Sequence, residues 1–316
     1  MKTLRFADTE TAGRYPLAVT EQAVWLAGTL RLVLPSLPAG TLLVPSLALP
    51  DVPVTPHRWT LSADGVKWPL PIVPAAAGTS APPSPDPRAS GEIDCWRLHD
   101  DLVNPTLTLE LEAPTPTRYL ISVSARAYTL AEPLAPGSEQ TTAAPIPPLS
   151  QLDAAPDIAR RICSPTSLAM LIGSLRAQTG AAVRHAVLED WQALVAECRD
   201  PATGLYGLWP LAIGAAARRG FPGAVEVFES WRDPLAVLAR GLPFVASIRF
   251  ARDALPGAPL AETGGHLVVV AGINNEHVLV FDPAAPSADS VARRYPAAAF
   301  TRAWLSQRGA AYILCP

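Results

Sequence analysis

The stretch that decides how this chain is interpreted is Arg161-Ile162-Cys163-Ser164-Pro165-Thr166-Ser167-Leu168-Ala169-Met170, in which a cysteine directly precedes an apolar helical run. Proline is best tolerated in the first turn of a helix, where its missing N–H loses no hydrogen bond. A helix is therefore predicted to begin at Ser164 or Pro165. The sulfur of Cys163 would lie at the positive end of the helix dipole, which favours thiolate over thiol. Most free cysteines are small buried hydrophobic residues, so a nucleophile is indicated only if the chain supplies partners.

The composition is that of a large globular chain. Its 316 residues allow two domains or one large one, and the net charge of −3 argues against nucleic acid as a partner. No apolar run approaches the length of about 20 residues that spans a bilayer. The first residues lack the apolar core of a signal peptide. We therefore expect a cytoplasmic protein, although a secreted protein whose leader had been removed would look the same.

The four cysteines do not have the spacing of a metal site. They stand at Cys95, Cys163, Cys198 and Cys315, with no CxxC and no nearby Cys/His pair. A disulfide framework is not implied for a chain of this size. We expect no metal and no cofactor.

Residues 1–131 have the pattern of an all-β module. Thr106–Glu112 and Tyr119–Ala125 alternate apolar and polar side chains as half-buried strands do, and Asp64-Gly65 between two short strands is a hairpin signal. Many short strands with frequent turns and almost no helix predict a sandwich or jelly-roll-like fold. Residues 132–150 are rich in proline and are predicted to form a semi-extended linker.

From residue 151 to residue 316 the pattern changes to helices followed by strands, which predicts an α+β domain. Helices are expected over 187–198, 209–219, 233–241 and 297–304. Strands are expected over 244–250, 266–273, 277–281 and 310–314.

A histidine and an aspartate mark the open end of one predicted hairpin. His266 begins the apolar strand, and Asp282 follows the returning strand. A register in which Gly272 pairs with Glu276 would place His266 directly opposite Asp282, with Cβ atoms about 5 Å apart. A slip of one residue would put them on opposite faces. A cysteine nucleophile needs a base, and the base needs a third group to orient it, so Cys163, His266 and Asp282 together favour nucleophilic catalysis.

Several ordered motifs resemble the papain-like cysteine peptidases of the bacteriocin double-glycine-leader peptidase-like family, in particular bacterial members with an N-terminal β-rich domain and no transporter. The motifs are Gln151, Cys163-Ser164-Pro165-Thr166-Ser167, Asp200-Pro201-Ala202-Thr203-Gly204-Leu205-Tyr206-Gly207-Leu208-Trp209-Pro210, Gly264-Gly265-His266-Leu267 and Asp282-Pro283-Ala284. The resemblance covers roughly residues 148–316. It implies Cys163 as nucleophile, His266 as general base, Asp282 as orienting residue and Gln151 as oxyanion donor.

Two departures from the family pattern concern the first of these motifs. Ser164 stands where many relatives have glycine, and Gln151 is about twice as far from Cys163 as in papain. The residues between them must loop for the amide to return to the cysteine.

The resulting expectation is hydrolysis of a peptide or protein substrate, with groove residues near Tyr206, Trp209 and Thr263. Packing is an equal alternative for these three. The same residue order serves transglutaminase-like acyl transferases, and an inactive peptidase scaffold that only binds is a further alternative. Four tryptophans of the β module, Trp25, Trp59, Trp68 and Trp96, leave open carbohydrate or protein contact.

Overall fold

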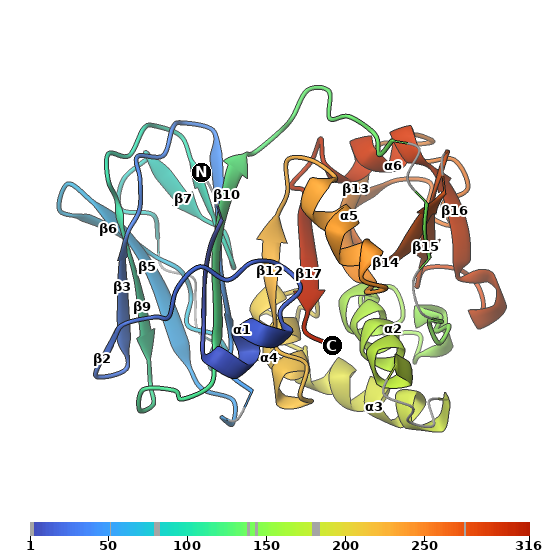
Figure 1. Cartoon of the computed structure of the whole chain (residues 1–316), viewed down its shortest axis with the longest axis horizontal. Coiled ribbons are helices and arrows are strands. Elements are labelled where there is room, and N and C mark those ends of the chain that lie inside the picture. Colours follow the sequence, from blue (N-terminus) through green and yellow to red (C-terminus); the bar gives the residue numbers. More distant parts are fainter. Residues whose placement is uncertain are drawn as a thin grey trace. The chain divides into compact units, whose positions relative to one another are not determined.

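The chain falls into two compact units in the computed structural model (Figure 1), which describes residues 3–50, 52–78, 83–137, 140–142, 145–178, 184–274 and 276–316. The first unit comprises Met1–Tyr128, Asp200–Val227 and Cys315, and the second comprises Thr129–Arg199, Phe228–Leu314 and Pro316. The sequence predicts a β-rich domain that ends at residue 131 and a second domain that begins at residue 151, and these domain boundaries stay a prediction. Residues 200–227, which follow the predicted boundary in sequence, pack with the N-terminal strands in the first unit.

The N-terminal strands of the first unit form two five-stranded antiparallel sheets. One has the order β1 (Leu4–Ala7), β10 (Leu120–Ala127), β4 (Thr41–Ala48), β8 (Trp96–Leu98) and β7 (Ala89–Gly91). The other has the order β2 (Trp25–Leu26), β3 (Thr29–Val33), β9 (Thr106–Leu111), β5 (His57–Ala63) and β6 (Val66–Pro69). Side chains from both sheets pack into one hydrophobic core, as two sheets with alternating inward positions do.

Local turn chemistry was a reliable guide in this unit. The hairpin of β5 and β6 turns at Asp64 and Gly65, which have φ values of 49° and 78°. The expectation of almost no helix missed α1 (Thr9–Arg14), whose N-cap Asp8 accepts hydrogen bonds from the backbone N–H groups of Glu10 and Thr11. A short polar segment with an aspartate cap can form one helical turn without the apolar periodicity that identifies longer helices.

The segment 200–227 contributes α4 (Trp209–Arg218) and β12 (Gly223–Val227). The predicted helix over 209–219 is confirmed, whereas β12 was not predicted. In β12 the buried Glu226 accepts hydrogen bonds from Arg5 at 2.7 and 2.6 Å, Tyr15 at 3.0 Å and Ser122 at 3.1 Å. The segment is therefore fixed to β1 and β10 by buried polar contacts, which an apolar pattern cannot reveal.

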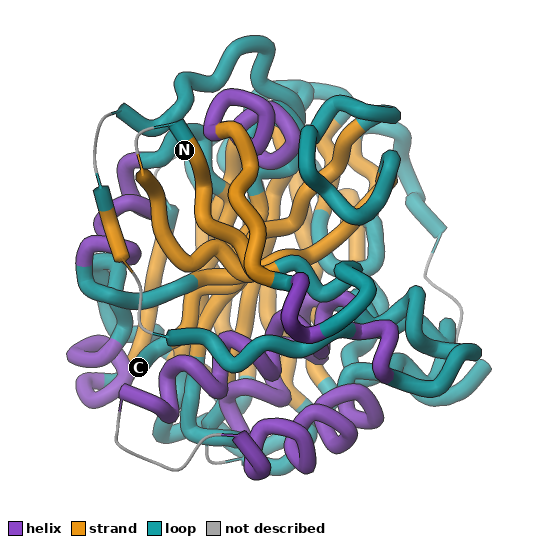
Figure 2. Tube along the Cα trace, turned by 90° about the vertical axis from the view of Figure 1, so that its right-hand side faces the viewer, coloured by secondary structure: helices purple, strands orange, loops and turns teal. Residues whose placement is uncertain are grey.

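The second unit contains helices and one antiparallel sheet. The helices are α2 (Cys163–Gln178), α3 (Arg184–Glu197), α5 (Arg232–Ala239) and α6 (Ala297–Trp304), with short 3-10 turns at Gln151–Asp153 and Ala288–Ser290. Its strands run in the order β17 (Ala310–Leu314), β13 (Phe244–Phe250), β14 (Thr263–Asn274), β15 (His277–Phe281) and β16 (Ala292–Pro296), and β11 (Thr141–Thr142) also pairs with β14. Figure 2 shows strands in orange and helices in purple.

Most predicted elements of this unit are confirmed, several with the same bounds. β13, β15, α6 and β17 coincide with the predicted ranges. The strand β16 was not predicted, because Arg293 and Arg294 interrupt its apolar pattern. β11 lies inside the predicted linker, where a two-residue strand has no signal of its own.

The predicted register of the β14–β15 hairpin is wrong. Near the turn Asn274 pairs with His277, and a β-bulge between Val270 and Gly272 then shifts the register so that Val269 pairs with Phe281. The predicted turn residue Asn275 lies outside the described residues. A bulge adds one residue to one strand and reverses which face its later side chains occupy.

The bulge decides the relation between His266 and Asp282. If the pairing near the turn continued without it, the two side chains would point to opposite faces of the sheet. With the bulge they share one face, as diagonal rather than direct neighbours, and their side chains meet.

Candidate active site

Cys163 is the first residue of α2, one position earlier than predicted. The amide and the hydroxyl of Thr166 both donate to the carbonyl of Ile162, at 3.1 and 2.7 Å, which closes the first turn of the helix. Pro165 lies in this turn, where its missing N–H is tolerated. The helix is buried from Ser164 to Leu175. The sulfur of Cys163 therefore lies at the N-terminus of a long, buried helix, where the helix dipole stabilises the negative charge of a thiolate.

Two contacts fix the start of α2 against β14. The Ser167 hydroxyl donates to the carbonyl of Leu267 at 2.9 Å. The backbone N–H of Leu267 in turn interacts with the Cys163 sulfur. Since Leu267 directly follows His266, the helix start and the histidine are held side by side. Ser164, the departure from the family pattern, has its hydroxyl 2.9 Å from that of Tyr312 and is buried.

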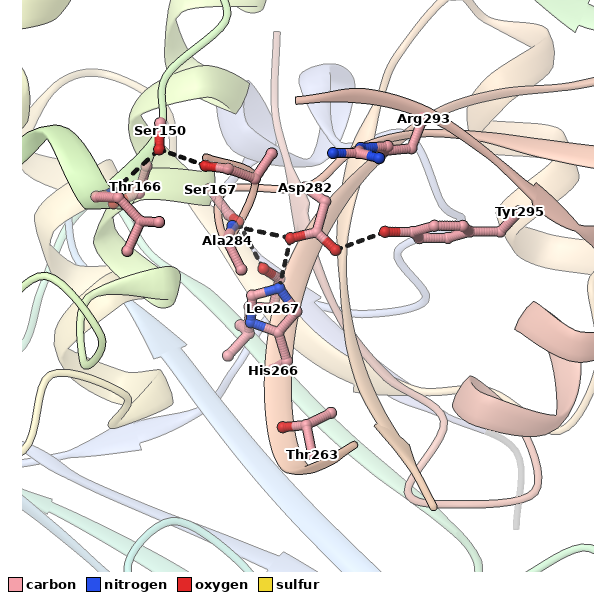
Figure 3. Close-up of polar contacts among 12 residues, drawn as sticks. Ser150, Thr166, Ser167, Thr263, His266, Leu267, Asp282, Ala284, Arg293 and Tyr295 are labelled. Atoms are coloured by element: carbon pink, nitrogen blue, oxygen red, sulfur yellow. Dashed lines mark hydrogen bonds and ion pairs between the residues drawn. The ribbon is translucent and has the colours of Figure 1, made fainter. Parts of the chain in front are cut away.

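His266 and Asp282 form a buried pair. His266 Nε2 lies 2.7 Å from Asp282 Oδ1 (Figure 3), and the two residues are 3% and 1% exposed. The imidazole of His266 also hydrogen-bonds with the thiol of Cys163. The backbone N–H of Ala284 donates to the same carboxylate oxygen at 2.9 Å. The structure thus brings together Cys163, His266 and Asp282, the three residues that the sequence grouped as a candidate site.

The electrostatics of the three groups favour charge separation. Burial alone lowers the pKa of His266, but the Asp282 carboxylate and the Cys163 sulfur outweigh it and raise that pKa from 6.5 to about 10. Burial raises the pKa of Cys163, yet the hydrogen bond to His266 and the charge of its ring bring the net pKa below its ordinary value. Burial likewise raises the pKa of Asp282, but the charge of His266 and donated hydrogen bonds lower it overall. A thiolate beside an imidazolium is the form that these shifts favour.

Tyr295 is a site neighbour that the sequence reasoning missed. Its hydroxyl donates to Asp282 Oδ2 at 2.6 Å, and the residue is fully buried. It lies on β16, opposite Val278 of β15. Tyr295 could have been found from the sequence only if Arg293-Arg294-Tyr295-Pro296 had been recognised as a third strand beside the hairpin.

Gln151 is tied to the loop that follows Asp282. Its backbone N–H donates to the carbonyl of Pro283 at 2.8 Å, and the hydroxyl of Ser150 donates to that of Ala285 at 2.6 Å. Gln151 is 4% exposed and its Oε1 has no hydrogen-bond partner among the described residues. Tight turns over residues 155–161 take up the long interval to Cys163. The loop that the sequence required is therefore present.

The three predicted groove residues have different positions. Thr263 lies at the start of β14, partly exposed, and its hydroxyl accepts a hydrogen bond from the N–H of Gly265 at 3.1 Å. Tyr206 and Trp209 belong to the first unit and are buried there, 7% and 4% exposed. Their side chains are packed, which is the alternative that the sequence left open.

Three of the four tryptophans considered for ligand contact offer no free ring. Trp59, Trp68 and Trp96 are buried in the core, and Trp25 is half-buried against Tyr119 with ring centroids 5.6 Å apart. Carbohydrate or protein contact through this unit stays a prediction. A ligand could not stack on the three buried rings.

Within the ranges that the structure describes, no three His, Cys, Asp or Glu side chains gather as a metal ion would require. Nor does any helix among those residues have the length and apolar character needed to cross a membrane.

Comparison with known proteins agrees with the chemistry of the site. The model of the Peptidase_C39 like family matches residues 144–312, which is more than half of the chain. The chain belongs to this family, and a function of the cysteine-peptidase type is supported in general terms.

Among solved structures, the chain is similar to a protein from Bacillus anthracis described as a C39-like peptidase. The likeness has 18% identity and a TM-score of 0.40, over 56% of this chain and 98% of that one. No curated protein matches the chain.

Proposed function

We propose that this chain is a papain-like cysteine peptidase, with Cys163 as nucleophile, His266 as general base and acid, and Asp282 as the residue that orients the imidazole. The observation that carries the proposal is the buried 2.7 Å contact between His266 and Asp282 beside a cysteine at a helix N-terminus. A nucleophile, a base and an orienting group in this order are what acyl transfer requires.

The reaction would proceed through a thioester. The Cys163 thiolate forms a bond to the carbonyl carbon of the scissile peptide, and the carbonyl electron pair moves onto oxygen. When the C–O double bond re-forms, the C–N bond breaks and His266 gives its proton to the leaving amine. Water then attacks the thioester while His266 takes the proton of that water. Loss of the C–S bond releases the acid and restores the thiolate.

Gln151 is proposed to hold the oxyanion together with the backbone N–H of Cys163. Two features support this role: the tether of Gln151 to Pro283, next to Asp282, and the burial of its side chain. Such donors act where negative charge develops in the transition state. Thr263 is proposed as a groove residue, because it begins the strand that carries His266.

Two finer features belong to the same proposal. The first unit would provide an accessory β-sandwich. We also place the chain with the double-glycine-leader peptidase-like branch that its motifs resemble, and in that case a quenched peptide with Gly-Gly before the scissile bond should be cleaved faster than one with Ala-Ala. Equal rates would remove this branch from the proposal.

The central test is the rate of iodoacetamide labelling of Cys163 as a function of pH, in the wild-type protein and in His266→Ala. We expect rapid labelling well below the pH at which a free thiol reacts, and loss of that reactivity in the variant. Labelling no faster than a free thiol, with no effect of the histidine, would contradict the proposal and favour an inactive binding scaffold.

Hydrolysis of quenched fluorescent casein, measured with and without an added primary amine, separates a peptidase from an acyl transferase. Release of peptides in water alone supports hydrolysis. Stable incorporation of the amine without peptide release would favour the transglutaminase-like alternative.

A further inference from the structure

The carboxylate of Asp282 is almost sealed from solvent, so the groups that donate to it decide its charge and orientation. It is 1% exposed. Oδ1 accepts from His266 Nε2 at 2.7 Å and from the N–H of Ala284 at 2.9 Å. Oδ2 accepts from the Tyr295 hydroxyl at 2.6 Å, the only donor to that oxygen among the described residues. A buried carboxylate without its donors is strongly disfavoured as an ion.

Both the ring and the backbone of Tyr295 are packed against neighbouring elements. Its ring is fully buried and stacks on Phe300 of α6, with centroids 6.2 Å apart and planes 20° apart. Its backbone pairs with Val278 of β15, the strand that leads into Asp282. β16 is the third strand of the antiparallel series β14, β15 and β16. In Figure 3 the phenol of Tyr295 and the imidazole of His266 reach the carboxylate of Asp282 from different sides.

The Tyr295 hydroxyl and the His266 imidazole hydrogen-bond to different oxygens of the Asp282 carboxylate. Rotation of the carboxylate would break both hydrogen bonds, so the pair fixes its plane and keeps Oδ1 directed at Nε2. The charged or titratable groups around it are His266 on β14, Cys163 on α2, and Tyr295 with its neighbour Arg293 on β16.

We propose that Tyr295 is a positioning residue of the active site: by donating to Asp282 Oδ2 it keeps the carboxylate ionised and aimed at His266. This inference rests on the proposed peptidase function, because the positioning matters only if His266 works on Cys163. Tyr295 is fully buried and would act through Asp282.

The sign of the effect follows from which states the phenol stabilises. It donates to the ionised carboxylate and gains little from the protonated one. Removing the hydroxyl therefore raises the pH at which Asp282 takes up a proton. A hydrogen bond to a buried charge corresponds to a shift of about one to two pH units.

The first experiment measures the titration of the Asp282 carboxylate and needs no substrate. In a Cys163→Ala background, the carboxyl carbon of ¹³C-labelled Asp282 is titrated by NMR, with and without Tyr295→Phe, and assigned by Asp282→Asn. We expect the titration of Asp282 to move upward by about one to two pH units in the Phe variant. An unchanged titration would overturn the proposal.

The second experiment reads catalysis with quenched casein as the probe. In Tyr295→Phe the acid limb of the kcat/KM profile should move to higher pH. Tyr119→Phe, which removes a buried hydroxyl in the other unit that accepts from the N–H of Ala23, should leave the limb in place. A uniform loss of rate at every pH would mean that Tyr295 is merely structural.

Two further measurements test the proposal if Tyr295→Phe does not fold, and separate its failure from failure of the proposed peptidase function. If Tyr295→Phe does not fold, 3-fluorotyrosine at all six tyrosines makes each phenol a stronger donor and should move the acid limb to lower pH. No movement would count against the proposal. Failure of the proposed function itself would appear separately, as the absence of rapid iodoacetamide labelling of Cys163 in the wild-type protein.

Discussion

The sharpest consequence of the site geometry concerns the replacement Asp282→Asn, which removes the charge beside His266 but keeps the shape of the side chain. The raised pKa of His266, about 10, is the balance of burial, which lowers it, against the Asp282 charge and hydrogen bond, which raise it. In the variant, burial remains and the main opposing effect is lost. An opposite charge at this range accounts for about 1–3 pH units.

The alkaline limb of peptide hydrolysis should therefore move down by about 1–3 pH units in Asp282→Asn. The direction is set because the imidazolium is the proton donor to the leaving amine, and activity is lost as pH rises through the pKa of His266. The assay is the kcat/KM profile for quenched casein over the full pH range in which the protein stays folded, with folding followed by circular dichroism.

The matched control is Asp289→Asn, which makes the same chemical change at an exposed position seven residues later. It should leave the alkaline limb in place. The reasoning would be refuted if folded Asp282→Asn kept the wild-type limb, or if the exposed replacement moved the limb equally.

Three further outcomes test other parts of the structure. Glu226→Ala should lower the free energy of unfolding by about 3–5 kcal/mol, because it removes the carboxylate that pairs with the buried guanidinium of Arg5. The same change at Glu262, in an exposed ion pair, should cost less than about 1 kcal/mol in urea melts. Gln151→Ala should reduce kcat by about 100- to 1000-fold while iodoacetamide labelling is unchanged, and an unchanged kcat would exclude the oxyanion role. Gly272→Ala should destabilise the fold by about 1–3 kcal/mol in thermal melts, since an added Cβ would lie 2.5 Å from a carbonyl of β11; wild-type stability would contradict this.

The sequence alone was sufficient where structure depends on neighbouring residues. A proline two residues after Cys163 and an apolar run beyond it predicted the start of α2 to within one position. The continuous apolar run of β13 and the turn at Asp64-Gly65 were likewise identified, because periodicity and turn propensity are properties of a few adjacent residues.

The sequence also identified His266 and Asp282 as a pair, although through a wrong register. Turn propensity did not reveal the bulge between Val270 and Gly272, because an extra residue in one strand changes the local chain very little. The pairing of the whole ladder decides it, and with it which face each side chain occupies.

Only the tertiary structure brought distant segments to the site and to the core. Tyr295 reaches Asp282 because a third strand, with two arginines in its pattern, adds to the hairpin. Gln151 reaches the same loop through a backbone hydrogen bond to Pro283. Glu226 binds Arg5 across 221 positions of sequence. Propensity and spacing describe what each segment can form by itself, but contacts of this kind depend on which segments are buried together, and that is settled only when the whole chain folds.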